Sequence, residues 1–114
     1  MASIALFDDN EVYLEILQQI LQTEGHDVSV HSSTSLDSPG VLKQADIFLI
    51  DVWFGTEKAG LSLVKKLKQQ ISDSKKIILM SSDSDVDKYA SEVTADGYIQ
   101  KPFDIPKLLS MLTL

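Results

Sequence analysis

Short apolar runs alternate along the chain with longer segments in which apolar residues recur every three or four positions. The short runs have the length and composition of buried strands, and they cover Ser3–Phe7, Val28–His31, Ile47–Ile50, Lys76–Met80 and Tyr98–Gln100. The segments with helical spacing predict amphipathic helices over Val12–Leu21, Leu61–Ile71, Val86–Val93 and Ile105–Leu112. Every predicted strand except the second is therefore followed by a clear helix.

The segment after the second predicted strand is less regular. Ser35–Gln44 is a weak helix candidate, because Pro39 and Gly40 would break a helix near its start. With this segment included, the chain forms five strand-then-helix units. Because right-handed crossovers place each helix against the sheet, the alternation predicts a parallel sheet with helices on both faces. In open sheets of this kind, ligands bind beyond the carboxyl ends of the strands.

The composition predicts one domain, residues 1–114, that lies outside any membrane. A chain of 114 residues, 44% of them hydrophobic, suffices for one core and is too short for two ordinary domains. No apolar run approaches the roughly 18 residues of a membrane span, and no signal segment opens the chain, so we expect a cytoplasmic protein. The absence of cysteine excludes disulfides, thiolate metal sites and cysteine nucleophiles. A net charge of −7 without a lysine cluster argues against direct nucleic-acid binding.

Polar residues stand where the predicted strands end. Asp8 and Asp9 follow the first strand, Asp51 the third, Ser81 the fourth and Lys101 the fifth. Since the carboxyl ends of parallel strands share one edge, these side chains should converge. Three carboxylates brought together repel one another, and a divalent cation relieves that repulsion. Oxygen ligands without histidine or cysteine suit a hard ion, so Mg²⁺ is the expected cofactor.

This set of residues predicts phosphoryl transfer. An Asp51 oxygen would attack phosphorus in line, while Mg²⁺, Lys101 and Ser81 neutralise the oxygens of the transferring group. The product would be an acyl phosphate on Asp51. Little acid or base assistance is needed, because a carboxylate is already ionised at neutral pH.

Each of these residues also has an ordinary structural interpretation. Taken alone, Asp8 and Asp9 would be the acidic cap of the first helix, where they would interact with the helix dipole. Asp51 would be a turn residue, and Ser81 and Lys101 would be surface or capping residues. Only their joint placement at one edge favours a functional site.

Two other groups of polar residues are assigned no chemistry. His26 and His31 are expected to lie away from this edge and to have no function. Ser82 or Asp83 is expected to cap the helix Val86–Val93. The acid-rich start of that helix then needs no further explanation.

Together these motifs resemble one known family. Asp8 and Asp9, Asp51 in "FLID", Ser81 in "ILMSS" and Lys101 in "DGYIQKPF" resemble the receiver domains of two-component response regulators. The resemblance covers the whole chain and implies an α/β fold with a doubly wound, five-stranded parallel sheet in the flavodoxin-like order 2-1-3-4-5, with five helices on both faces. It implies phosphorylation of Asp51 by a sensor histidine kinase or a histidine phosphotransfer domain. A changed surface would then bind a downstream effector that the sequence does not identify, and a phosphorylation-dependent homodimer is compatible with this.

The resemblance also assigns metal ligands. Asp9 and Asp51 would bind Mg²⁺ directly together with the backbone carbonyl of Trp53, and Asp8 would act largely through metal-bound water. Lys101 would pair with the phosphoryl group.

The remaining implied roles concern the switch and one peptide bond. Ser81 and Tyr98 would form a switch pair, in which the hydroxyl moves toward the phosphoryl group and the ring turns inward. The bond between Lys101 and Pro102 is usually cis in the family.

The loop after Asp51 departs from the family pattern. Residues Val52–Gly60 lack the usual proline and reach their glycine later. This departure supports an alternative, an unphosphorylated pseudo-receiver that acts as an interaction module. Two enzyme alternatives are weaker, because a phosphatase would need a general acid where Trp53 stands and a flavin carrier would need a Ser/Thr/Gly-rich loop where Asp8 and Asp9 stand. We therefore expect no enzyme, apart from assistance to the domain's own phosphorylation and dephosphorylation.

Overall fold

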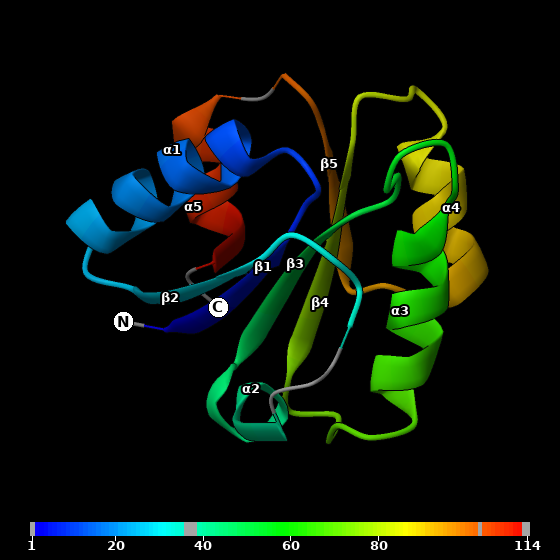
Figure 1. Ribbon diagram of the computed structural model, residues 1–114, viewed down its shortest axis with the longest axis horizontal. Coiled ribbons are helices and arrows are strands. Elements are labelled where there is room, and N and C mark those ends of the chain that lie inside the picture. Colours follow the sequence, from blue (N-terminus) through cyan, green and yellow to red (C-terminus); the bar gives the residue numbers. More distant parts are fainter. Residues whose placement is uncertain (1, 36–38, 103, 113–114) are drawn as a thin grey trace.

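The computed structural model describes residues 2–35, 39–102 and 104–112. A parallel sheet forms its centre (Figure 1). The strands are β1 (Ser3–Phe7), β2 (Asp27–His31), β3 (Ile47–Asp51), β4 (Lys76–Ser81) and β5 (Gly97–Gln100). They lie in the order β2-β1-β3-β4-β5 with parallel pairing throughout, which confirms the predicted doubly wound sheet.

Helices cover both faces of this sheet. They are α1 (Glu11–Thr23), α2 (Pro39–Gln44), α3 (Ala59–Lys68), α4 (Val86–Val93) and α5 (Ile105–Leu112). Figure 1 shows α1 and α5 on one face and α3 and α4 on the other. The third helix ends at Lys68, before its predicted end at Ile71. None of the helices in the described part of the chain is both long and apolar enough to span a bilayer.

Alternate residues of the central strands face opposite pairs of helices. In β3, Phe48 and Ile50 pack in the cluster that includes residues of α3 and α4, whereas Ile47 and Leu49 pack in the cluster with α1 and α5. All five residues of β3 are buried, as expected of a strand covered on both faces. The strand therefore reads as a continuous apolar run, and packing on both sides holds Asp51 at its end.

The start of α2 corrects the sequence analysis. This helix begins at Pro39, so Pro39 and Gly40 open the helix and do not interrupt it. Proline fits the first helical position because its missing N–H would have no intrahelical acceptor there. The preceding part of the predicted segment, residues 36–38, lies outside the described residues.

Candidate functional site

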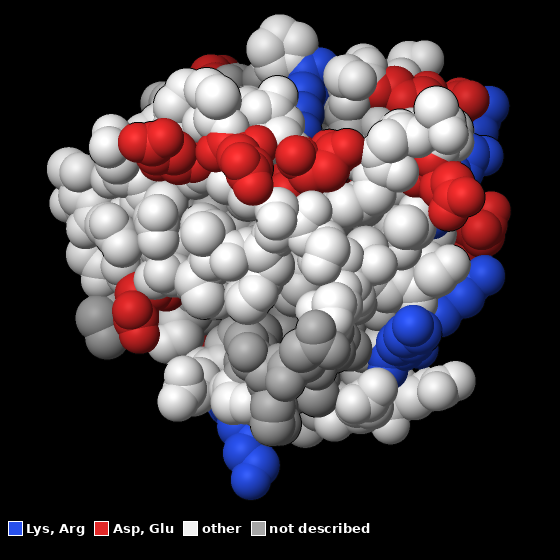
Figure 2. All heavy atoms as spheres, viewed as in Figure 1, with Lys and Arg blue, Asp and Glu red and all other residues white. Residues whose placement is uncertain are grey.

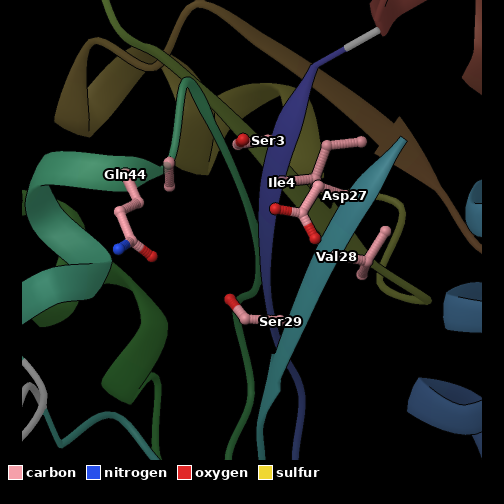
Figure 3. Close-up of a pocket in the computed structure, with 7 residues that line it drawn as sticks. Ser3, Ile4, Asp27, Val28, Ser29 and Gln44 are labelled. Carbon is pink, nitrogen blue, oxygen red and sulfur yellow. The ribbon is translucent and has the colours of Figure 1, made fainter. Parts of the chain in front are cut away.

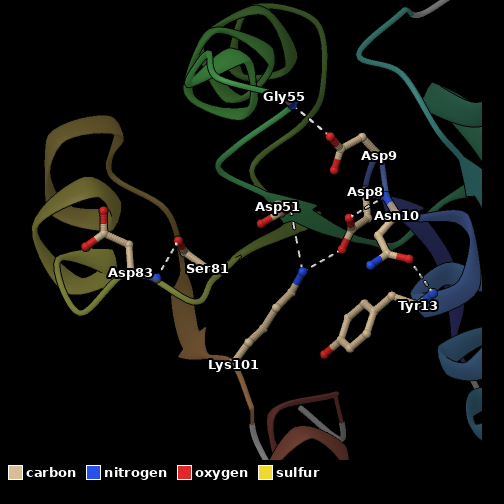
Figure 4. Close-up of polar contacts among 9 residues, drawn as sticks. All are labelled: Asp8, Asp9, Asn10, Tyr13, Asp51, Gly55, Ser81, Asp83 and Lys101. Carbon is tan, nitrogen blue, oxygen red and sulfur yellow. Dashed lines mark hydrogen bonds and ion pairs between the residues drawn. The ribbon is translucent and has the colours of Figure 1, made fainter.

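The carboxyl ends of the strands bring the predicted polar residues together. Asp8 and Asp9 follow β1, Asp51 ends β3, and Lys101 follows β5. Figure 4 shows these side chains turned toward one another, with Ser81 at the end of β4 beside them. The convergence that was expected from strand order is therefore present in the fold.

Three carboxylates form the centre of the site. Asp8, Asp9 and Asp51 each offer an oxygen, and these oxygens lie within 4.8 Å of one another. Asp8 and Asp51 are buried, at 0% and 7% exposure, whereas Asp9 is exposed. The pKa of Asp51 is raised from 3.8 to about 7: burial is the main cause, the Lys101 ammonium opposes it, and Asp8 and Asp9 add to it. This concentration of negative charge is suited to a hard cation.

The Lys101 ammonium lies inside this acidic group. Its Nζ donates to Asp8 Oδ2 at 2.6 Å and lies 3.6 Å from Asp51 Oδ2. The same nitrogen lies 4.2 Å from the centroid of the Tyr13 ring. The peptide bond between Lys101 and Pro102 is cis, as the resemblance implied. Lys101 is thus held by two carboxylates and an aromatic face.

The acidic pair does not cap α1. Asn10 is the N-cap, and its Oδ1 accepts a hydrogen bond from the Tyr13 N–H at 3.1 Å. Asp8 Oδ1 accepts from the Asn10 N–H at 3.0 Å, and Asp9 Oδ2 accepts from the Gly55 N–H at 2.7 Å. The structural interpretation of Asp8 and Asp9 as a helix cap is therefore wrong, because Asn10 has that role and leaves both carboxylates at the sheet edge.

The turn between β4 and α4 is organised around Ser81 and Asp83. Ser81 is fully buried, and its Oγ accepts a hydrogen bond from the Asp83 N–H at 3.1 Å. Asp83 Oδ1 in turn accepts from the Asp85 N–H at 2.9 Å, and the Tyr89 hydroxyl donates to Asp83 Oδ2 at 2.8 Å. The N-cap of α4 is Asp85, which makes no side-chain capping bond. The prediction that Ser82 or Asp83 caps this helix is wrong, because Asp83 orders the turn before it.

The loop after Asp51 forms a small hairpin. Phe54 and Glu57 pair as an antiparallel bridge around a turn in which Gly55 has a φ of +64°, a conformation that favours glycine. Behind the hairpin the Lys58 ammonium lies 5.4 Å from the Trp53 ring centroid and 4.8 Å from that of Tyr89. Lys58 thus lies beside two aromatic rings.

Gly60 fixes the start of α3 against Asp51. A Cβ at this position would overlap the carbonyl group of Asp51, and the Gly60 N–H donates to the Val52 carbonyl at 3.0 Å. Only glycine permits so close an approach. The third helix therefore starts directly behind the strand end that carries Asp51.

One histidine lies nearer to the site than expected. His31 ends β2 and therefore stands at the same edge of the sheet, which corrects the prediction that it lies elsewhere. Its ring stacks on Phe7 with a centroid distance of 4.6 Å, and burial lowers its pKa. His26 does lie away from the edge, where its Nδ1 accepts from the Ala2 N–H at 3.1 Å.

Several contacts at the site were not predicted. No role was predicted from the sequence for Tyr13, Tyr89 or Lys58. On the face shown in Figure 2, several acidic side chains form a row over α1 and the adjacent end of the sheet, and others lie on the side of α4. A hollow of about 140 Å³ between Ser3 and Asp27 lies at the other, amino ends of β1 and β2 and takes no part in the site (Figure 3).

Residues 4–113 match the family model of the response regulator receiver domain. The chain belongs to this family. The receiver is 29% identical over 111 residues to the transcriptional regulatory protein YkoG of Bacillus subtilis, a match that covers 96% of the chain and 48% of YkoG. The chain thus spans about half the length of the curated relatives it matches. Receiver domains of this family are phosphoacceptor signalling domains.

Solved receiver structures share the fold. A receiver domain from Methanospirillum hungatei superposes with a TM-score of 0.84 at 22% identity, covering 98% of this chain and 90% of that one. The BeF3-activated N-terminal receiver domain of Klebsiella pneumoniae RstA gives 0.82 at 24% identity, with coverage of 96% and 94%. At these identities the likeness establishes the architecture, and the chemistry must be argued from the receiver's own residues.

Proposed function

We propose that this receiver accepts a phosphoryl group onto Asp51 with Mg²⁺ as cofactor, and that phosphorylation changes the surface it offers to a partner. The observation that carries the proposal is the meeting of the buried Asp51 carboxylate with Asp8, Asp9 and the Lys101 ammonium at one sheet edge. Three segments that are distant in sequence deliver these groups, and a fourth delivers Ser81. Phosphoryl transfer uses a carboxylate oxygen as nucleophile together with positive charge near the transferring group, which Lys101 and a bound cation would supply here.

The acidic group fits a magnesium ion. The three carboxylate oxygens within 4.8 Å of one another form an oxygen-only donor set, which hard cations prefer. Asp8, Asp9 and Asp51 would hold the ion, and the Trp53 backbone carbonyl is proposed as a further ligand. When bound, Mg²⁺ would supply positive charge to the carboxylates and to the phosphoryl oxygens.

The receiver's own residues would perform the transfer. An Asp51 oxygen forms its bond to phosphorus as the P–N bond to the donor imidazole breaks and the bonding electron pair returns to that nitrogen. The Lys101 ammonium, 3.6 Å from Asp51 Oδ2, pairs with a phosphoryl oxygen. The Ser81 hydroxyl donates to another phosphoryl oxygen, a movement that breaks its bond with the Asp83 N–H. Tyr98, which is 48% exposed on β5, then turns inward as the second half of the switch.

The proposed phosphodonor is a sensor histidine kinase or a histidine phosphotransfer domain, acting in the cytoplasm. Val12 and Ile16 lie one turn apart on α1 beside the site and are 67% and 50% exposed, which gives such a donor an apolar surface to cover. The output would pass to a downstream effector that the sequence does not identify; the relative YkoG is named a transcriptional regulatory protein. The receiver itself, with a net charge of −7, would not bind nucleic acid. A homodimer formed on phosphorylation remains part of the proposal.

The alternative of an unphosphorylated interaction module depends on the altered loop. That loop folds as a hairpin whose Gly55 N–H contacts Asp9, with Asp51 and Lys101 in place behind it. Nothing in the described part of the chain favours the alternative.

Intact-mass measurement tests the proposed function. We expect acetyl phosphate to add one phosphoryl group in the presence of Mg²⁺ and none when the metal is chelated. Asp51→Asn should abolish the addition, whereas Asp73→Asn, which neutralises an exposed acid outside the site, should leave it intact. Phosphate on Asp51→Asn at the parent's level would contradict the assignment.

A further inference from the structure

The ring of Tyr13 forms part of the surroundings of Lys101. Its centroid lies 4.2 Å from the Lys101 Nζ, within the range of a cation–π contact. Lys101 is 17% exposed, so water screens this contact less than it would at the surface. Figure 4 shows the ring alongside the ammonium, away from the two carboxylates. Lys101 therefore has an uncharged neighbour as well as its acidic ones.

The position of Tyr13 is linked to that of Asp8. The Tyr13 N–H donates to the Asn10 side chain at 3.1 Å, and the Asn10 N–H donates to Asp8 at 3.0 Å. The ring also packs against the buried cluster that includes Leu14 and Leu17. Hydrogen bonds through Asn10 thus connect Tyr13, on the first turn of α1, to Asp8 just before the helix.

An aromatic face and a carboxylate hold an ammonium in different ways. Lys101 Nζ contacts one oxygen each of Asp8 and Asp51, and Mg²⁺ binding and attack on phosphorus would draw on the same two carboxylates and so compete with these contacts. A ring face attracts the cation through the quadrupole of the ring, and it carries no net charge that would bind the metal. It can therefore keep the ammonium at the site when the carboxylates turn to other partners.

We propose that Tyr13 is a positioning residue for phosphotransfer, whose ring holds the Lys101 ammonium beside the incoming phosphoryl group. This inference rests on the proposed function of Asp51. A cation–π contact of ordinary strength corresponds to roughly a two- to thirtyfold change in a rate or an affinity. The ring, and not the hydroxyl, is the active part of Tyr13 in this role.

Three variants of the full chain test it. Tyr13→Leu removes the ring, Tyr13→Phe keeps it, and Leu109→Ala loosens the same core cluster at a position with no described contact to Lys101. The measurements are the Mg²⁺ affinity by calorimetry, the affinity for beryllium fluoride in saturating Mg²⁺ by fluorine NMR, and the rate of phosphorylation by acetyl phosphate.

We expect Tyr13→Leu to keep the Mg²⁺ affinity and to lose roughly two- to thirtyfold in the other two measurements. Tyr13→Phe should keep most of the parent's rate, and Leu109→Ala should keep it while losing stability. In a Lys101→Ala background, Tyr13→Leu should have no further effect, because the contact is already gone.

Other outcomes overturn the inference. If Tyr13→Leu matches the parent, if Tyr13→Phe is as slow as Tyr13→Leu, or if the loss persists without Lys101, the ring does not act through Lys101. If the parent itself neither takes up phosphate nor binds beryllium fluoride, the proposed function fails and the role of Tyr13 fails with it.

Discussion

The two sides of Asp51 hold their cations in different ways. On the α1 side, Lys101 is 17% exposed and makes ionic contacts with Asp8 and Asp51. On the α4 side, Lys58 is exposed and lies between the rings of Trp53 and Tyr89. A charge held among buried carboxylates interacts strongly with whatever enters the site, whereas an exposed cation on aromatic rings contributes little beyond local order. The cation on the α1 side is thus placed for chemistry, whereas the cation on the α4 side holds the loops.

The largest expected effect comes from the charge on the α1 side. Because the folded pKa of Asp51, about 7, lies above its ordinary 3.8, the folded state binds the proton more tightly than the unfolded state. The contribution of Asp51 to the free energy of unfolding of the metal-free receiver should therefore fall as pH rises from about 4 to about 7, by at most about 4 kcal/mol, and then level off. Denaturant titrations at a series of pH values measure this slope.

Asp51→Asn should remove most of that slope and be more stable than the parent at neutral pH without metal. Saturating Mg²⁺ should stabilise the parent more than the variant, because the ion binds only the folded site. If the free energy of unfolding had the same pH dependence in the two proteins, the carboxylates of the acidic group would not repel one another measurably. The contrast between the two sides of Asp51 would then lose its electrostatic basis.

A smaller effect is expected at the junction between the two sides. Gly60→Ala should destabilise the receiver by about 1–3 kcal/mol, because the new methyl group overlaps the Asp51 carbonyl and the backbone must shift. Gly40→Ala is the matched control, since its nearest neighbour is a flexible side-chain atom of Gln44 at 4.0 Å. Urea denaturation separates the two variants, and equal stabilities would mean that α3 does not press against the end of β3.

The contacts of Lys101 with carboxylates could be predicted from the sequence, and those of Lys58 with aromatic rings could not. Asp8, Asp51 and Lys101 each follow an apolar run, and parallel strands bring their carboxyl ends to one edge, so a pattern of single residues sufficed. The positions of Lys58 and Tyr89 depend on how the hairpin after Asp51 turns and on how a loop meets a helix from another unit. The periodic pattern of apolar residues along the sequence does not encode a contact between a loop and a helix of another unit.

The wrong predictions for individual residues have similar causes. Asn10 was overlooked as the cap of α1 because two acids precede it, and the helix-breaking tendency of Pro39 was weighed without its suitability for a first helical position. His31 was placed by its neighbours in sequence, whereas the parallel pairing of β2 with β1 sets its actual position. In each case a local rule was applied where the tertiary structure decides.

The smallest expected effect concerns Lys58. Lys58→Met keeps the length of the side chain and removes its charge, so the loss should be that of an exposed cation–π contact with Trp53, about 0.5–1 kcal/mol. Trp53 is the only tryptophan, and its emission should change when the ammonium is removed. Lys65→Met, on an exposed position of α3, is the control and should leave the emission unchanged. Phosphorylation by acetyl phosphate should slow by less than about threefold, because Lys58 reaches the rings and not the phosphoryl site. A loss as large as that of Lys101→Ala would mean that both cations act on the transferring group, and that the division between the two sides of Asp51 is wrong.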